Sequence, residues 1–287
     1  MNVAIATCAA LPAGDEDTPA LIGELAALGH HAEAVRWDGP ADWAAYDLVM
    51  VRSTWDYHDR RGEFLEWARS VPRLENPAEV LTWNTDKRYL RDLEAAGVPV
   101  VPTLWDPAGL PEWPDYVIKP AVSAGARDTA RWSADEAGPA AEHLSRLRSE
   151  GRTVMVQPYL DAVDSAGETA LIFFDGVFSH AVRKAPILKA GAGIQPAIAD
   201  TKDEREQIAA RAASPAELAL GGRVLQTVPG RPLYARVDLI PGPDGAPVLL
   251  ELELTEPSLF LGHAPGAAAR LAAALARRLT CGAELAR

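Results

Sequence analysis

Residues 231–256 read RPLYARVDLIPGPDGAPVLLELELTE, two apolar segments joined by a turn and carrying acidic residues. Side chains at positions i and i+2 of a strand point to the same face, so Glu251 and Glu253 share one face of the second segment. The turn residues 242–245 (GPDG) predict a β-hairpin, which brings Asp238 beside the two glutamates. The opposite face of the second strand then carries leucines: Leu250, Leu252 and Leu254.

Three carboxylates on one sheet face repel each other unless positive charge lies among them. Carboxylate oxygens are the ligands that Mg²⁺ prefers, and proteins usually hold this ion with one or two carboxylates plus substrate phosphates. The hairpin therefore indicates either a magnesium site formed by Asp238, Glu251 and Glu253 or a solvated strand face whose acids never meet. The upstream sequence favours the magnesium site.

The chain has 287 residues, of which 48% are apolar, and it is long enough for two domains or for one domain with lobes. Its 40 acidic residues against 28 basic ones give a net charge of −12. This charge argues against nucleic acid or an anionic membrane as the main partner. It is compatible with a local basic pocket that binds a small phosphorylated molecule.

The longest apolar runs, such as ALIFF at 170–174, are too short to span a bilayer. The first residues, MNVAIA, lack the basic and apolar regions of a signal peptide. Cys8 and Cys281 lie far apart in the sequence, without metal-ligand spacing, which fits a reducing compartment. We therefore expect a cytoplasmic protein without a membrane partner.

The first 75 residues alternate between strand-like and helix-like segments. Strands are predicted at residues 2–7, 31–37 and 47–52, and helices at 18–28 and 60–70. This alternation predicts a small parallel α/β domain over residues 1–75. Ligands of such sheets gather at the carboxyl ends of the strands.

The third predicted strand runs into Arg52-Ser53-Thr54-Trp55-Asp56-Tyr57. Arg52 suits a carboxylate or a phosphate, because its guanidinium binds oxyanions with two parallel hydrogen bonds. The alternative is that Arg52 pairs with a nearby acid such as Asp56.

A second α/β region follows residue 76. Its helices are predicted at 85–96, 133–150, 214–227 and 267–279, its strands at 116–120, 153–159, 169–174 and 177–184, with an extended piece at 98–103 and a loop of small residues at 186–199.

Two lysines in this region predict a phosphate site, although no GxxxxGK[ST] motif occurs and no GxGxxG follows the first strand. Lys87 lies at the start of a predicted helix, and Lys119 follows the apolar residues 116–118. A lysine in such surroundings needs an anionic partner, because an unpaired buried ammonium is costly. The small residues 121–127 that follow can wrap a phosphate chain with their backbone N–H groups.

The order of these features resembles the ATP-grasp superfamily, in particular the branch related to bacterial glutathione synthetase and the ribosomal-protein glutamyl ligases. The matching motifs are DKRYLRDLEAAGVPVVPT at 86–103, IKP at 118–120, VQPYL at 156–160, Gly167-Glu168, RVD at 236–238 and ELELTEPS at 251–258. Together they span about residues 75–280. The segments 52–57, 83–87 and 179–184 look closer still to a group that includes the cyclo-ligase of D-cycloserine biosynthesis.

The resemblance implies an α/β protein with the ATP-grasp fold in three parts. Residues 1–75 would form a Rossmann-like pre-ATP-grasp domain. Residues 76–160 would form a lobe with the two lysines and the phosphate loop, and residues 161–287 a second lobe with the magnesium site.

The resemblance also implies a role for each matching residue. The ATP phosphates would contact Lys87, Lys119, Ser123 and Gly125, and the hinge that reads adenine would be Gln157, Pro158, Tyr159 and Leu160. Glu168 would bind the ribose or order the site, with Asp161 and Asp164 as alternatives. Arg183, or its rival Lys184, would stabilise the transferring phosphoryl group. Asp238, Glu251 and Glu253 would hold Mg²⁺, and Glu253 stands where relatives often have asparagine. The substrate pocket would combine Arg52, Ser53 and Asp56 with Thr255, Glu256 and Ser258.

The activity implied is that of an ATP-dependent carboxylate–amine ligase acting on a small amino-acid-like substrate. ATP would convert a carboxylate into an acyl phosphate, and an amine would attack it to give an amide, a peptide or a cyclic product. Two alternatives stay open: an intramolecular cyclo-ligase of the D-cycloserine type, and a non-catalytic ATP-binding protein that kept the fold. Relatives are often dimers or tetramers, so a homo-oligomer also stays open.

Overall fold

Three sheets organise the chain in the computed structural model, which describes residues 1–195 and 207–285. The first sheet has the order β2-β1-β3-β4 and its strands are parallel. Its strands are β1 (Asn2–Thr7), β2 (His31–Arg36), β3 (Leu48–Ser53) and β4 (Leu74–Glu75), and its helices are α1 (Thr18–Ala27) and α2 (Arg61–Ser70). The parallel α/β unit expected at the N-terminus is therefore present.

The second sheet is antiparallel, with the order β5-β8-β6-β7. Its strands are β5 (Leu104–Trp105), β6 (Asp115–Pro120), β7 (Ala130–Ser133) and β8 (Val154–Pro158). Helix α5 (Ala137–Ser149) packs on it, placing Leu144 and Leu147 in one cluster with Ile118 and Val156. This packing leaves the other face of β6 and β8 available to the third sheet.

The third sheet is also antiparallel, with the order β11-β10-β9-β12-β13. Its strands are β9 (Glu168–Phe174), β10 (Val177–Lys184), β11 (Ile208–Arg211), β12 (Tyr234–Pro241) and β13 (Pro247–Glu253). Helix α7 (Pro215–Thr227) covers one face, where Leu171 and Phe173 point. Helix α8 (Ala267–Leu285) covers part of the other face, where Ile172 and Phe174 point.

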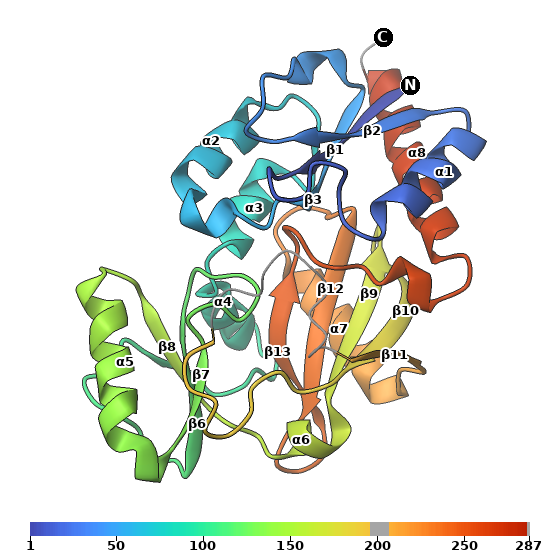
Figure 1. Cartoon of the computed structure of the whole chain (residues 1–287). Coiled ribbons are helices and arrows are strands. Elements are labelled where there is room, and N and C mark those ends of the chain that lie inside the picture. The colour runs from blue at the N-terminus through green and yellow to red at the C-terminus, as the bar shows by residue number, and fades with distance from the viewer. Residues whose placement is uncertain (196–206, 286–287) are drawn as a thin grey trace.

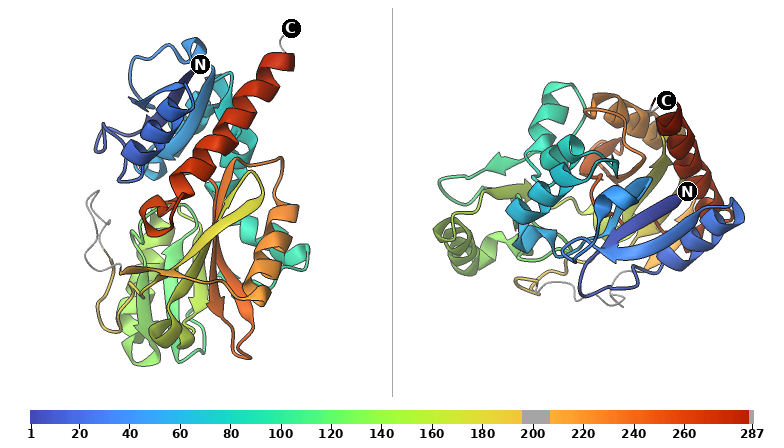
Figure 2. Two further views of the ribbon diagram at one scale, coloured as in Figure 1. Left: turned by 90° about the vertical axis from the view of Figure 1, so that its right-hand side faces the viewer. Right: turned by 90° about the horizontal axis from the view of Figure 1, so that it is seen from above.

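Helix α8 joins the N-terminal unit to the third sheet. It packs Leu271, Leu275 and Leu279 in one cluster with Leu21 and Leu25 of α1 and with Ile172 of β9. Figure 1 shows α8 running from beside α1 down to β10, and the side view in Figure 2 shows the same path. The part of that same face of the third sheet which α8 leaves uncovered carries the charged residues described below.

The predicted hairpin is present, and Asp238 lies directly opposite Glu251 in the β12–β13 ladder. Its alternation, however, is broken by a β-bulge between Asp238 and Leu239. Leu249, Leu252 and Leu254 pack together in the core beneath α7, but Leu250 packs elsewhere, with Ile240 and Val101. The expectation that Leu250 shares a face with Leu252 was therefore wrong, because one extra residue turns Leu250 and Glu251 to the same side.

One helix was predicted at 85–96. The structure has a helix that begins later, at Tyr89, and a second helix before it. Helices α3 (Ala78–Asn84) and α4 (Tyr89–Ala95) are separated by a turn that contains Lys87. The Asn84 side chain ends α3 by bonding the backbone of β13, accepting from the Leu254 N–H and donating to the Leu252 carbonyl. Short elements without a clear periodic pattern were not predicted: β4, β5, β7, β11 and α6 (Ala162–Ala166).

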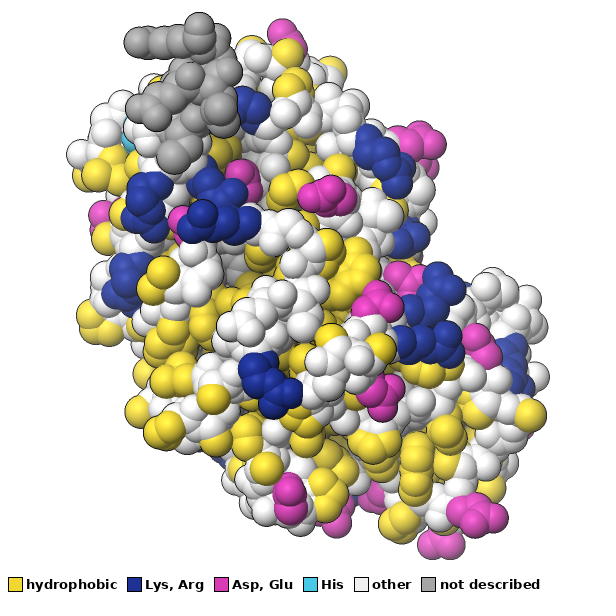
Figure 3. All heavy atoms as spheres, turned by 180° about the vertical axis from the view of Figure 1, so that it is seen from behind, with side chains coloured by type: hydrophobic (Ala, Val, Ile, Leu, Met, Phe, Trp, Pro, Cys, Tyr) yellow, Lys and Arg dark blue, Asp and Glu magenta, His cyan; other side chains and the backbone are white. Residues whose placement is uncertain are grey.

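The loop predicted at 186–199 is described as far as residue 195, and the rest lies outside the described residues. In the described part of the chain, we find no helix both long and apolar enough to cross a membrane. On the face turned away from Figure 1, Lys and Arg side chains lie in separate groups with acidic side chains near them (Figure 3).

His143 on α5 predicts a pH dependence of stability. Trp132 Nε1 donates to its Nδ1 at 3.1 Å, and its Nε2 lies 3.0 Å from the Asp128 carbonyl, an arrangement that suits the neutral ring. Burial lowers the pKa of His143 from 6.5 to about 4. The unfolded chain therefore takes up the proton first, and the stabilising contribution is complete above pH 6.5 and lost as pH falls toward 4. The loss should be at most about 3 kcal/mol.

Urea unfolding of the wild type and of His143→Gln between pH 7 and 4 checks this. The difference in unfolding free energy between the two proteins should shrink as pH falls, since glutamine takes up no proton. Parallel pH profiles would contradict the buried neutral histidine.

Candidate active site

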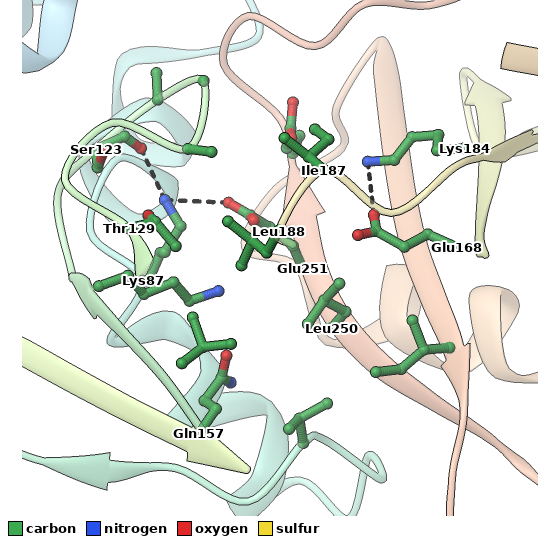
Figure 4. A pocket seen from close by; sticks show the side chains of 18 of the residues that line it. Lys87, Ser123, Thr129, Gln157, Glu168, Lys184, Ile187, Leu188, Leu250 and Glu251 are labelled. Atoms are coloured by element: carbon green, nitrogen blue, oxygen red, sulfur yellow. Dashed lines mark hydrogen bonds and ion pairs between the residues drawn. The ribbon is translucent and has the colours of Figure 1, made fainter. Parts of the chain in front are cut away.

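A cavity of about 320 Å³ lies between the second and third sheets. Figure 4 shows its two walls, with Lys87 and Gln157 on one side and Glu251, Glu168 and Lys184 on the other. Most of the residues predicted for the site line it: Lys87, Lys119, Ser123, Gly125, Gln157, Pro158, Tyr159, Leu160, Glu168, Lys184, Glu251, Glu253, Glu256 and Ser258.

Lys87 bridges the two walls. Its ammonium donates to the Ser123 carbonyl at 2.8 Å and lies 3.1 Å from Glu251 Oε1. Burial would lower the pKa of Lys87, but the charge of Glu251 and of other carboxylates outweighs it and raises that pKa. Lys87 is therefore held as a cation between the loop after β6 and the acidic strand β13.

Lys119, at the end of β6, lines the same cavity without an ion pair or hydrogen bond of its ammonium to any residue in the described part of the chain. Burial lowers its pKa, and the nearby Lys87 lowers it further, although Glu251 opposes this. A buried ammonium in this position gains from an anionic ligand, because such a ligand replaces the lost hydration.

The loop of small residues after β6 has an unusual backbone. Gly125, Ala126 and Asp128 adopt φ of +59°, +55° and +56°, a region that only glycine enters without strain. Arg146 and Arg152 both bond Asp128, and Ser123 Oγ donates to the Arg127 carbonyl at 2.8 Å. The loop is thus anchored at its far end, while Ser123 and Gly125 face the cavity.

The predicted hinge residues follow one another along the cavity wall at the end of β8. Gln157 is buried and donates to Thr103 Oγ1 at 2.9 Å. Tyr159 donates to Asp164, and the guanidinium carbon of Arg131 lies 3.5 Å from its ring centre. Asp164 is therefore engaged with Tyr159 and Arg131, whereas Glu168, its rival for the ribose, lines the cavity.

The structure separates the two candidates for the transferring phosphoryl group. Lys184 lines the cavity, where its ammonium lies 2.9 Å from Glu168 and 2.8 Å from Asp238. Arg183 points to the other face of β10 and donates to the carbonyls of Ser165 and Ala166. Alternation along β10 thus places Arg183, the first choice from sequence, outside the cavity and its rival inside.

Arg236 is a charged cavity residue that sequence reasoning missed. It is buried on β12, where its guanidinium bonds both Asp238 and Glu253. Its NH1 also donates to the Ser258 carbonyl at 3.2 Å. The signal was present in the motif RVD, since positions 236 and 238 of a strand share one face.

The three predicted metal ligands lie on one sheet face, each beside a cation. Lys184 and Arg236 contact Asp238, Lys87 contacts Glu251, and Arg236 contacts Glu253. Within residues 1–195 and 207–285 no group of three or more His, Cys, Asp or Glu is close enough to hold a metal ion. The carboxylate groups of this face are thus each paired with a cation of the protein.

Burial raises the pKa values of two carboxyl groups on this side of the cavity. Burial raises the pKa of Glu253 to about 7, against the lowering effect of Arg236. Burial and then the charge of Glu253 raise the pKa of Glu256 well above its usual range. The pKa values of Asp238 and Glu251 are lowered, because their cationic neighbours outweigh the effect of burial.

The predicted substrate residues fall into two groups. Glu256 and Ser258 line the cavity. Thr255, which is buried, points its hydroxyl at Asn84 and does not line it.

The three from the N-terminal unit are engaged elsewhere. Arg52 pairs with Asp15, not with Asp56 as the alternative had it. Ser53 bonds Thr7, and Asp56 accepts from Trp37 and Arg60. Each of these three side chains thus has a partner within the protein. The residues of segment 52–57 that do line the cavity are Trp55 and Tyr57.

Similar structures define the class of protein. An ATP-grasp protein with a RimK domain from Sphaerobacter thermophilus superposes with a TM-score of 0.66 at 19% identity, covering 95% of this chain and 98% of that one. The two sheets that enclose the cavity therefore form an ATP-grasp fold, as the resemblance implied.

Nearer relatives define the family. The cycloserine biosynthesis protein DcsG of Streptomyces lavendulae is 39% identical over 287 residues, covering 92% of this chain and 94% of that protein. The crystal structure of D-cycloserine synthetase DcsG superposes with a TM-score of 0.87 at 37% identity, covering 97% of this chain and 100% of that one. A family model described as the N-terminal domain of D-cycloserine synthetase DcsG matches residues 3–76. The chain belongs to the DcsG family, and it is an ATP-dependent carboxylate–amine ligase.

The two neighbours on β10 make a matched pair for mutagenesis. Lys184→Met should lower the rate of ADP release by about 10²–10³-fold, as expected when a positioned donor to a developing charge is removed. Arg183→Met should lower the rate less than about tenfold, because within the described residues its guanidinium bonds backbone carbonyls of α6 alone. Equal losses in the two variants, measured in a coupled ADP assay, would contradict this assignment.

Proposed function

We propose that this ligase closes a ring within one amino-acid-like substrate, giving a cyclic amide of the D-cycloserine kind. The similarity to the DcsG relatives over nearly the whole chain carries the proposal. The ring of D-cycloserine contains an amide between its carbonyl carbon and the nitrogen of an N–O unit. A substrate for such a product carries a carboxylate and this nitrogen in the same molecule.

ATP would occupy the part of the cavity between the two sheets. Lys87, Lys119 and the loop with Ser123 and Gly125 would take its phosphates, since lysines and backbone N–H groups converge there. The adenine would lie along Gln157–Leu160, where the bulge has turned the apolar Leu250 into the opposite wall. Glu168 would meet the ribose.

The acidic face fits Mg²⁺ as the partner of the triphosphate. Its donors are carboxylate oxygens on one face, and burial raises the pKa values of Glu253 and Glu256, so that a bound divalent cation would favour their charged forms. Asp238, Glu251 and Glu253 would hold the ion after the lysines turn from them to the phosphates. The ion would supply charge neutralisation at the oxygens of the phosphate chain.

The chemistry requires no protein nucleophile. The γ-phosphoryl group moves to a substrate carboxylate oxygen, and ADP leaves. The substrate nitrogen then attacks the carbonyl carbon, a C–N bond forms, the C–O bond to phosphate breaks, and the nitrogen loses its proton to solvent. Lys184 and Arg236 would neutralise the transferring group, so that catalysis consists of positioning and electrostatic stabilisation.

The substrate would lie at the end of the cavity nearest the N-terminal unit. Trp55 and Tyr57 line that end together with Glu256, Ser258 and Phe260.

We also infer a cytoplasmic location, which the free thiol of the buried Cys8 supports.

The mass of the product tests the proposal. β-Aminooxy-D-alanine, the open-chain form of D-cycloserine, should give ADP and a product lighter by one water when it is the only substrate. Pairs of ordinary amino acids should give little ADP. A product that joins two substrate molecules would contradict ring closure and indicate intermolecular ligation, and no ADP from either set would contradict the proposed substrate class.

Glu251→Gln tests the metal assignment. It removes one carboxylate charge opposite Lys87 and should lower ADP release about 10²–10³-fold while raising the Mg²⁺ concentration needed for half-maximal rate. Glu33→Gln removes an exposed carboxylate outside the cavity and serves as the control. Undiminished ADP release by Glu251→Gln would exclude Glu251 as a ligand.

A further inference from the structure

The loop at residues 255–261, which follows β13, is held almost entirely by side chains. The backbone carbonyls of residues 255–259 are each paired with a different side chain: Thr255 with Tyr234, Glu256 with Trp55, Pro257 with Arg52, Ser258 with Arg236, and Leu259 with His180. Buried backbone groups need partners, and here no neighbouring strand supplies them. The loop therefore takes its shape from these contacts.

One of these side chains, Arg52 of the N-terminal unit, forms buried ion pairs with two aspartates beside the loop. Arg52 has 1% of its side chain exposed and lies 2.6 Å from Asp15 and 3.6 Å from Asp17. Its NH1 donates to the Pro257 carbonyl at 2.6 Å. A buried ion pair is a weak source of stability, because desolvation offsets its attraction, and it serves better to fix an arrangement.

Asp17 fixes the most strained residue of the loop. Its two carboxylate oxygens accept from the N–H groups of Leu261 at 2.8 Å and Leu259 at 3.2 Å. Between these amides lies Phe260, whose φ of +52° is unfavourable for a bulky side chain. Such a conformation persists when the surroundings determine it, and the clamp by Asp17 on both sides does so.

These contacts join two segments that line the cavity. Arg52 is the last residue but one of β3, which leads to Trp55 and Tyr57 in the cavity lining. The loop contributes Glu256, Ser258 and Phe260 to the same lining. Neither Arg52 nor Asp17 lines the cavity itself, so they act on it only through the segments they hold.

We propose that Arg52 and Asp17 are positioning residues, which fix the substrate half of the cavity by holding the loop 255–261 to the N-terminal unit. The proposal rests on the proposed function in placing the substrate beside Trp55, Tyr57 and this loop. The nucleotide half, formed by the two lysines and the hinge, has no direct contact with either residue.

Asp17→Asn is the first variant. It keeps the size of the side chain but turns an NH₂ group toward one of the two loop amides. Arg52→Lys is the second: it keeps the charge beside Asp15 but loses the fork that reaches Pro257 as well. Asp38→Asn is the matched control, because Asp38 bonds Arg36 and Arg60 in the same unit, away from the loop.

Hydrogen–deuterium exchange gives a readout that requires no ligand. In Asp17→Asn the amides of Leu259 and Leu261 should exchange at least about tenfold faster than in the wild type, while the exchange rates in the loop 121–127 stay unchanged. In Asp38→Asn the exchange rates of both loops should equal those of the wild type. Unchanged exchange at residues 259–261, or faster exchange throughout the chain, would overturn the proposal. If Asp17→Asn does not fold, the same comparison with Arg52→Lys decides.

Calorimetry separates the two halves of the cavity. The dissociation constant of D-cycloserine, titrated with ADP present, should rise at least about tenfold in either variant, whereas that of ADP alone should change less than about twofold. An equal rise of the dissociation constants of D-cycloserine and ADP would show a merely structural role and overturn the inference. Absence of D-cycloserine binding by the wild type would count against the proposed function, and the exchange experiment would still decide the positioning role.

Discussion

Charge balance on the acidic face of the third sheet is the constraint on which the rest of the structure depends. Asp238, Glu251 and Glu253 lie together because the β12–β13 ladder places them there, and their repulsion requires cations close by. The structure supplies these from three directions: Lys87 from the turn between α3 and α4, Lys184 from β10 and Arg236 from β12 itself. Ion pairs thus join this face to elements that the proposed function would bring together around ATP.

This arrangement explains why the same residues serve in folding and in the proposed chemistry. Each lysine that now faces a carboxylate lies within the cavity, so it can exchange that partner for a phosphate without a large movement of the backbone. The exchange would free the carboxylates for Mg²⁺. Lys119 differs from the other cations, since its lowered pKa reflects a buried ammonium that a bound anion would stabilise.

The sequence predicted much of this site, because strand alternation and motif order determine where most of its side chains point. Asp238 opposite Glu251 followed from the turn, and the lysines followed from their apolar surroundings. The face to which Leu250 points was predicted wrongly, because a bulge leaves no periodic signal in the sequence. Arg183 was preferred to Lys184 because the sequence did not show which face of their strand borders the cavity. Arg52 attracted a substrate role because its acidic partners, Asp15 and Asp17, lie far from it in sequence. Only packing between distant elements shows such pairs.

The central claim is that the enzyme activates a carboxylate by phosphorylation. The most direct measurement uses β-aminooxy-D-alanine labelled with ¹⁸O in its carboxylate and follows the label into the inorganic phosphate that is released. Transfer through an acyl phosphate predicts one labelled oxygen in each phosphate, since the C–O bond breaks when the nitrogen attacks. Label-free phosphate, formed together with cyclic product, would contradict this account.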